Sequence, residues 1–204
     1  MDDTTVERPA RRDVIVVEGG DIILALPQDQ FLQVSSVVLS YASPVFKALF
    51  GPRFKESSQV RSDVQPKEVA LPEDDPVIMT DLCHLLHSQK PSNHNERGVS
   101  SPQELYALAV AADKYDCVHT ISLQTEAMLS RFLAFRGTVK LSFQQMAYLI
   151  AAAASLNHGR HYYLFTKRLI LDYYELYSGL ITDKTDEILS LETILTKNSV
   201  RPPV

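Results

Sequence analysis

The sequence predicts an α+β fold that is mostly helical. Early in the chain, two β-prone apolar runs are separated by the turn Pro27-Gln28-Asp29-Gln30, which is a hairpin signal. From residue 75 onward, apolar residues recur with helical spacing and follow residues that commonly cap helices. The 204 residues are 45% apolar and 22% charged, so the chain can bury the core of one large domain or two small ones.

Three short strands are expected in the first part of the chain. Asp21–Leu26 and Phe31–Ser35 flank the turn, and Lys67–Leu71 alternates charged and apolar residues in the way a half-buried strand does. Asp13–Glu18 could form a further short strand, but residues 1–20 as a whole are assigned to an N-terminal tail.

Helices are expected at 36–42 and 44–50, because Ser43-Pro44 supplies a cap followed by a proline at the first helical position. Asp75-Pro76 opens a helix over 76–88 in the same way. Ser101-Pro102-Gln103-Glu104 adds a capping box, in which Glu104 reaches back to the start of the helix. A further helix follows over about 118–135, and the polar stretches 52–66 and 88–100 are interpreted as loops.

The last third of the chain reads as a set of helices. Ser142 and Gln145 form a capping box ahead of an apolar stripe that ends at Leu156, and helices are expected at 160–177 and 183–197. The break at 136–140 is a candidate domain boundary. We therefore expect one domain over 21–135, a helical extension over 141–197 and a disordered tail over 198–204.

Composition argues against several classes of function. The net charge of −5 disfavours nucleic-acid binding, which needs a basic surface. Two cysteines rule out a disulfide framework and a four-cysteine zinc site. The chain has no glycine-rich phosphate loop, nucleophile elbow or kinase motif, so we expect no catalytic residues, no cofactor and no small-molecule substrate.

Targeting and membrane signals are also missing from the sequence. The first twenty residues lack an apolar stretch of signal-peptide length, and the longest apolar run is the nine residues Met146–Ala154. A membrane-spanning helix needs about 20 apolar residues. The expected protein is soluble and intracellular, in the nucleus or the cytoplasm, with no membrane partner.

A few titratable residues are spaced so that they invite a chemical interpretation. Cys83 and His87 lie four residues apart on an expected helix and could share a metal, with His84 and Cys117-x-His119 as further ligands. The alternative is that Cys83 is a packed core thiol and the histidines are surface residues at a helix end. No second cysteine pair or His-Glu-x-x-His pattern accompanies them, so no metal site is assigned.

Two other polar clusters receive structural interpretations. His158 and His161 flank the start of a helix and are expected to be solvated or capping residues. The acidic run Glu73-Asp74-Asp75 is interpreted as a helix N-terminus, where the helix dipole favours negative charge.

An ordered set of motifs occupies two stretches of the chain. The first runs from Asp21 to Phe50 and contains Ser43-Pro44-Val45-Phe46. The second runs from Leu105 to Asp116 and ends in Ala111-Ala112-Asp113-Lys114-Tyr115-Asp116. Together they resemble the BTB/POZ domain, most of all the BTB proteins of filamentous fungi with a helical C-terminal tail. The resemblance covers about 21–135 and implies a small three-stranded sheet flanked by helical hairpins.

The segment Ser36–Phe50 is more apolar than a pair of surface helices requires, since an amphipathic helix needs only one apolar stripe. Either it lies at the heart of a helical core, or one side packs on the core and another side on a partner. In the BTB family the first helix commonly lies at a dimer interface. The resemblance therefore implies binding to another copy of this chain or to another BTB protein, with these candidate interaction residues: Asp21, Ser36, Val37, Val38 and Tyr41.

The resemblance implies a non-enzymatic protein–protein interaction module that homodimerises. Two alternatives are a substrate adaptor of a cullin-based E3 ubiquitin ligase and a transcription-associated scaffold. Cullin-binding BTB domains often carry a hydrophobic-x-Glu motif after the helix expected at 76–88. The only glutamate in that loop is Glu96, preceded by His94-Asn95, so the motif is not matched.

The sequence also departs from the family where the second strand ends. In many BTB proteins a histidine and a basic residue follow that strand, and this chain has Ser35 and Ser36 there. Asp21 matches the acidic residue of the family but lacks its usual basic companion. Because a buried carboxylate needs compensation, we expect Asp21 to bind backbone amides or these serines.

Overall fold

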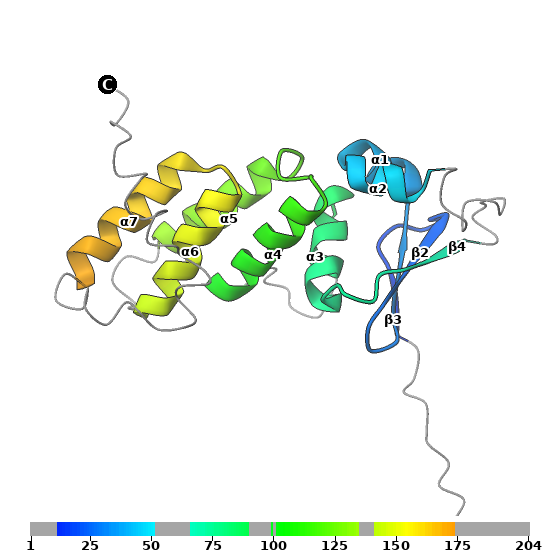
Figure 1. Ribbon diagram of the computed structural model, residues 1–204, viewed down its shortest axis with the longest axis horizontal. Coiled ribbons are helices and arrows are strands. Elements are labelled where there is room, and N and C mark those ends of the chain that lie inside the picture. Colours follow the sequence, from blue (N-terminus) through cyan, green and yellow to red (C-terminus); the bar gives the residue numbers. More distant parts are fainter. Residues whose placement is uncertain (1–11, 52–65, 90–98, 100, 135–140, 174–204) are drawn as a thin grey trace, which may run out of the picture. The chain divides into compact units, whose positions relative to one another are not determined.

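The computed structural model describes residues 12–51, 66–89, 99, 101–134 and 141–173 (Figure 1). The chain divides into two compact units. The sheet unit comprises Met1–Gly98 and Lys114–Ile121, and the helical unit comprises Val99–Asp113 and Ser122–Val204. The described residues confirm a mostly helical α+β fold with a small sheet and C-terminal helices. Its elements are β1 (Arg12–Ile15), β2 (Ile22–Leu26), β3 (Gln30–Val34), α1 (Ser36–Ala42), α2 (Pro44–Leu49), β4 (Lys67–Ala70), α3 (Pro76–Leu86), α4 (Pro102–Lys114), α5 (Ser122–Ala134), α6 (Phe143–Ser155) and α7 (Gly159–Tyr173).

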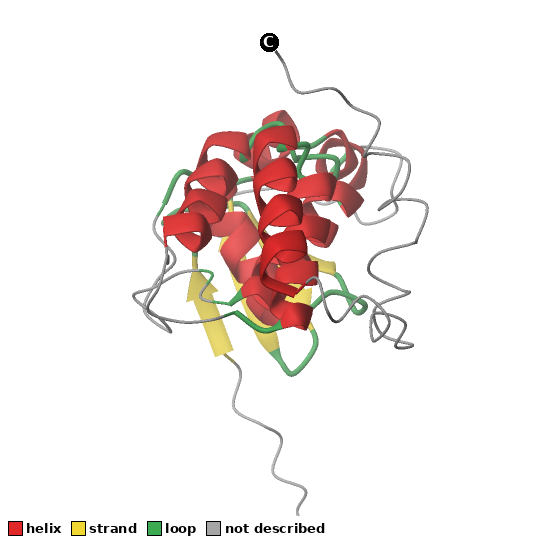
Figure 2. Ribbon diagram, turned by 90° about the vertical axis from the view of Figure 1, so that its left-hand side faces the viewer, coloured by secondary structure: helices red, strands yellow, loops and turns green. Residues whose placement is uncertain are grey.

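The four strands, yellow in Figure 2, form one sheet in the order β1-β3-β2-β4. β2 and β3 are the expected hairpin and pair antiparallel, with Leu24 opposite Leu32. Gln28 and Asp29 both have positive φ, of 61° and 55°, which tightens the turn between the strands. β4 lies parallel to β2 and closes the other side of the hairpin.

The sheet has four strands, so the expectation of three was wrong. β1 pairs parallel with β3, with Val14 opposite Leu32. It lies inside the range 1–20 that the sequence assigned to a tail and overlaps the optional strand at 13–18. The edge of β3 would otherwise leave its backbone N–H and C=O groups unpaired, and β1 satisfies them. This pairing joins residues distant in sequence, which local patterns do not reveal.

One face of the sheet forms the core of the sheet unit. The inward residues of β2 and β3 are buried, and α3 packs against β3 and α1. Alternation of buried and half-exposed residues along β2 is the pattern of a strand with one covered face. The apolar side chains buried on β2, β3 and β4 are Ile22, Leu24, Leu26, Leu32, Val34 and Val69.

Capping side chains set the ends of the short helices in this unit. Ser43 ends α1 and begins α2, where its hydroxyl accepts from the Phe46 N–H at 3.0 Å. Asp75 caps α3 by accepting from the N–H groups of Val77 and Ile78 at 2.9 and 3.0 Å. These caps confirm the helix starts expected at Pro44 and Pro76.

Capping boxes also open two helices of the helical unit. Ser101 and Glu104 bond reciprocally at the start of α4, and Ser142 and Gln145 do so at α6. α7 packs against α6 and α5. The helix expected at 183–197 and the tail at 198–204 lie outside the described residues, as do 135–140, where a domain boundary was expected. The domain division therefore stays a prediction.

The two histidines at the start of α7 lie in the packing between α5 and α7. His161 is buried and its Nε2 lies 2.9 Å from Ser130 Oγ, while His158 Nε2 lies 2.9 Å from the hydroxyl of buried Thr125. The expectation that these histidines are solvated or capping residues was wrong for His161. Its ring is covered because α7 packs against α5, which the spacing of the histidines alone does not indicate.

Candidate interaction surface

The helices α1 and α2 present an uncovered apolar surface, which we call the α1–α2 face. It consists of Val37, Tyr41, Pro44, Val45 and Ala48, all exposed. Val37 and Tyr41 are four residues apart and lie on the same side of α1. These two residues are 62% and 91% exposed, and with Pro44, Val45 and Ala48 they form a group of exposed apolar residues rather than a single one.

The opposite side of the same two helices is anchored in the core of the sheet unit. Leu39 and Phe46 are fully buried. The Phe46 ring stacks on Phe50 at 5.7 Å and on Tyr115 at 4.3 Å between ring centroids. Ser43 Oγ also donates to the carbonyl of Tyr115. α2 is thereby held in place, so the exposed side is a defined surface of the fold.

Asp21 holds the first turn of α1. The Ser36 N–H donates to Asp21 Oδ1 at 2.7 Å, and the Ser36 hydroxyl donates to Asp21 Oδ2 at 2.6 Å. The expectation that this carboxylate binds backbone amides or the neighbouring serines is confirmed. Both oxygens are used by Ser36, so Asp21 supports the α1–α2 face from beneath.

The five candidate residues thus occupy different positions. Val37 and Tyr41 are exposed on the α1–α2 face. Val38 is half-buried, Ser36 is buried, and Asp21 is half-buried beneath the helix. Two of the five therefore expose apolar surface, and Ser36 and Asp21 fix the helix that carries it.

The buried carboxylate of Asp74 connects the segment just before α3 to residues 114–115. The sequence did not predict this contact. Asp74 accepts from the Tyr115 hydroxyl at 2.9 Å and from Lys114 Nζ at 2.8 Å. Burial, followed by the hydrogen bond to Asp74, raises the pKa of the Tyr115 phenol. The acidic run was interpreted as a helix start, which holds for Asp75 but not for Asp74. Sequence spacing offered no signal for this pairing, because its partners lie 40 and 41 residues away.

The hairpin, the α1–α2 pair and the segment around Tyr115 together match a known protein family. The family model of the BTB/POZ domain matches residues 18–133. The chain belongs to the BTB/POZ family. The match spans the hairpin, the α1–α2 pair and the segment around Tyr115, and so confirms the resemblance stated above. A comparison with curated proteins finds no match.

BTB domains are protein-interaction modules that mediate self-association and the binding of other proteins. In this BTB domain, the α1–α2 face lies inside the matched range, whereas α6 and α7 follow it. Within the part of the chain that the structure describes, no helix is both long enough and apolar enough to span a bilayer.

The thiols of this BTB domain lie in its interior. Cys83 and Cys117 are buried thiols, and burial raises the pKa of each to about 12. A metal ligand or nucleophile needs the thiolate, which such a pKa disfavours at neutral pH. Among the described residues, no three His, Cys, Asp or Glu side chains gather as a metal site would require.

His84 and His87 on α3 are both engaged with the protein. The expectation of surface histidines was wrong for His84, which is buried with Nδ1 2.8 Å from the carbonyl of Thr80. α3 buries residues around most of its circumference, so the helix has little free surface near its end. His87 is half-buried and contacts both its own helix and Ser35, at the start of α1.

Proposed function

We propose that this BTB domain works as a non-enzymatic interaction module that binds a second copy of itself through the α1–α2 face. The observation that carries the proposal is the exposure of Val37 and Tyr41 on a helix whose other side buries Leu39 in the core. Covering such apolar side chains is favourable by about 25 cal/mol for each Å² removed from water.

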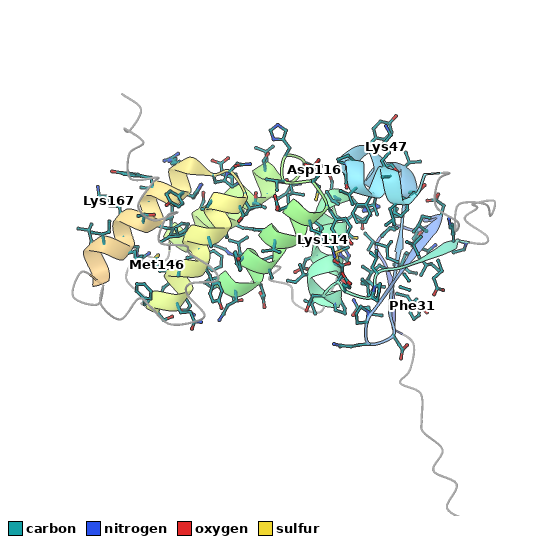
Figure 3. All side chains as sticks on the ribbon, viewed as in Figure 1. Phe31, Lys47, Lys114, Asp116, Met146 and Lys167 are labelled. Carbon is teal, nitrogen blue, oxygen red and sulfur yellow. The ribbon has the colours of Figure 1, made fainter. Side chains whose placement is uncertain are left out.

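The charge pattern of the face supports self-association. Between Ser36 and Phe50 the only charged residue is Lys47, which is exposed on α2 and labelled in Figure 3. Two copies can therefore meet without bringing charged clusters together, although each chain carries a net charge of −5. A two-fold axis beside α1 would place Tyr41 of each copy against the apolar surface of the other, as symmetric dimers require.

The chemistry of the interior supports an interaction role without catalysis. The two thiols have raised pKa values of about 12, and the buried carboxylate of Asp74 is occupied by Lys114 and Tyr115. Nucleophilic catalysis needs an activated side chain beside a base, and neither group is so arranged. We therefore propose no cofactor and no small-molecule substrate for this domain.

The deciding experiment measures the mass of the protein in solution with a matched pair of variants. Val37→Asp places a charge on the α1–α2 face, and Val77→Asp places the same charge on α3. Both valines are 62% exposed and each is the second residue of its helix. We expect wild type and Val77→Asp to sediment as dimers at micromolar concentration, and Val37→Asp to sediment as a monomer.

Two outcomes would overturn the proposal. A wild-type protein that stays monomeric across the micromolar range excludes the homodimer. Equal weakening by Val37→Asp and Val77→Asp would place the dimer interface elsewhere. The alternatives, a cullin adaptor and a transcription-associated scaffold, are tested by pull-down with a purified cullin scaffold and with chromatin-associated proteins, using Tyr41→Asp as the control for this face.

A further inference from the structure

A histidine lies directly beneath the first turn of the helix that carries the α1–α2 face. Ser35 is the N-cap of α1, and its backbone N–H donates to His87 Nε2 at 3.1 Å. His87 Nδ1 lies 2.7 Å from the carbonyl oxygen of Cys83, one turn earlier in α3. The imidazole thus connects the end of α3 to the start of α1.

These two contacts determine where the proton of the ring is. The carbonyl of Cys83 can only accept a hydrogen bond, so Nδ1 must carry the hydrogen. The N–H of Ser35 can only donate, so Nε2 must offer its lone pair. His87 is therefore a neutral imidazole in the Nδ1–H form, with both nitrogens in use.

We propose that His87 makes the interaction face sensitive to pH, because the neutral ring holds the start of α1 and protonation of Nε2 releases it. This inference rests on the proposed function of the α1–α2 face. A proton added to Nε2 points at the Ser35 N–H, and two donors cannot share a hydrogen bond. The ring or the Ser35 backbone must then move, and Val37 lies only two residues along the chain.

Apart from the His87 contact, the start of α1 is held by the two bonds from Ser36 to Asp21 and by the bond from the Leu39 N–H to the Ser35 carbonyl, and none of these bonds accepts from the Ser35 N–H. Ser36 is held by Asp21, but the capping bond from the Val38 N–H to Ser35 Oγ is long, at 3.4 Å. α1 contains only seven residues, and isolated helices of that length are unstable in water. Its geometry, and with it the position of Tyr41, depends on contacts such as the one from His87.

The groups around His87 are consistent with a neutral ring at pH 7. Burial is the largest cause that lowers the pKa of His87 below its ordinary value of 6.5, and His84 lowers it further. The Cys83 carbonyl acts in the opposite direction. β3 and α1, which pack against α3, contain no acidic or basic side chain in their spans. Asp21, a carboxylate at this end of α1, has both oxygens bonded to Ser36.

The direction of the pH effect follows from the lowered pKa of His87. An unfolded or released histidine takes up a proton near pH 6.5, whereas the ring bound to Ser35 does so only at lower pH. The free energy that the contact contributes is fully present above pH 6.5, decreases below that value, and is lost once the pH falls through the lower pKa of the bound ring. Acidification should therefore weaken binding through the α1–α2 face.

The test follows self-association from pH 7.5 to pH 5.0 by sedimentation. We expect the wild-type dimer to weaken several-fold, with a limiting slope of about tenfold per pH unit for each titrating His87. In His87→Gln the side-chain carbonyl can still accept from Ser35 but does not titrate, so its dimer should be nearly independent of pH. His119→Gln, at an exposed histidine of the same unit, is the control and should keep the wild-type slope. An unchanged slope in His87→Gln, or a flat wild-type profile, overturns the inference.

A second readout does not depend on dimerisation or on any variant. In wild-type protein, NMR of the His87 ring should show the Nδ1–H tautomer at pH 7.5. The amide signals of Ser35 and Val38 should then shift with the same midpoint as the ring. If the protein is monomeric at every pH, the proposed function fails and this titration still decides the role of His87. Two results would refute the role of His87 whatever the oligomeric state. One is a neutral ring that carries its proton on Nε2 at pH 7.5, and the other is a Ser35 amide signal that does not shift as the ring titrates.

Discussion

Two apolar stretches of this chain, Ser36–Phe50 and Met146–Ala154, differ in how the fold covers them. In α6 the residues Met146, Ala147 and Leu149–Ala153 are all buried. In α1, Val37 and Tyr41 remain exposed, although ten of the fifteen residues of Ser36–Phe50 are apolar. High apolar content therefore marks a surface for a partner only where the fold leaves one side of the segment uncovered.

The size of the side chains and the neighbouring elements explain the difference. The alanines of α6 are small, and the separation of two packed helices depends on the side chains at their contact. α7 packs against α6 and helps to cover it. α1 and α2 are short and pack one side on the core of their own unit, so the larger Tyr41 and Val45 lie exposed on the other side.

The largest expected loss of stability comes from a substitution in the buried helix α6. Ala152→Asp places a carboxylate at a fully buried position of α6. We expect it to lower the free energy of unfolding by about 3 kcal/mol or more, because an unpaired buried charge is costly. Urea denaturation followed by circular dichroism measures this loss. A loss below about 1 kcal/mol would show that α6 is much less enclosed than the structure indicates.

An intermediate effect concerns the histidines beside α7. Burial is the largest cause that lowers the pKa values of His158 and His161, so the unfolded chain takes up protons first as the pH falls below 6.5. The stability of the helical unit should be greatest above pH 6.5 and should decrease below it. Urea midpoints at pH 7.5 and 5.5 test this.

His161→Gln should reduce this pH dependence, because a glutamine can bond Ser130 without titrating. The exposed His119 again provides the control, since His119→Gln should leave the difference between the two midpoints unchanged. Equal midpoints at both pH values in the wild-type protein would contradict the expected burial of His161.

The smallest effect is expected at the exposed segment. Val37→Asp and Val77→Asp should each change the stability of the monomer by no more than about 0.5 kcal/mol, as is usual for surface positions. The measurement is urea unfolding at a protein concentration below that at which dimers form. A much larger loss in Val37→Asp alone would mean that Val37 belongs to the core, and the contrast with α6 would disappear.

Much of the fold could be predicted because its signals are local. Three capping signals act within one helical turn, and each begins a helix in the structure. They are Ser43-Pro44, Asp75-Pro76 and the capping box of Ser142 with Gln145. β1 was not predicted as part of the sheet, because its place depends on the free edge of β3. The buried role of Asp74 was missed for the same reason, since its partners come from distant residues.

The sequence by itself determined the hairpin, the helix starts and the membership of the BTB/POZ family. It also showed that Ser36–Phe50, which follows the hairpin, is more apolar than a pair of surface helices requires. Each of these depends on residues close in the chain or on the order of motifs along it. Only the tertiary structure decided which side of that segment is uncovered and which nitrogen of His87 carries a proton. The physical reason is that exposure and hydrogen-bond roles depend on neighbours in space. Ser35 and His87 are 52 residues apart in sequence, but the Ser35 backbone nitrogen lies 3.1 Å from His87 Nε2.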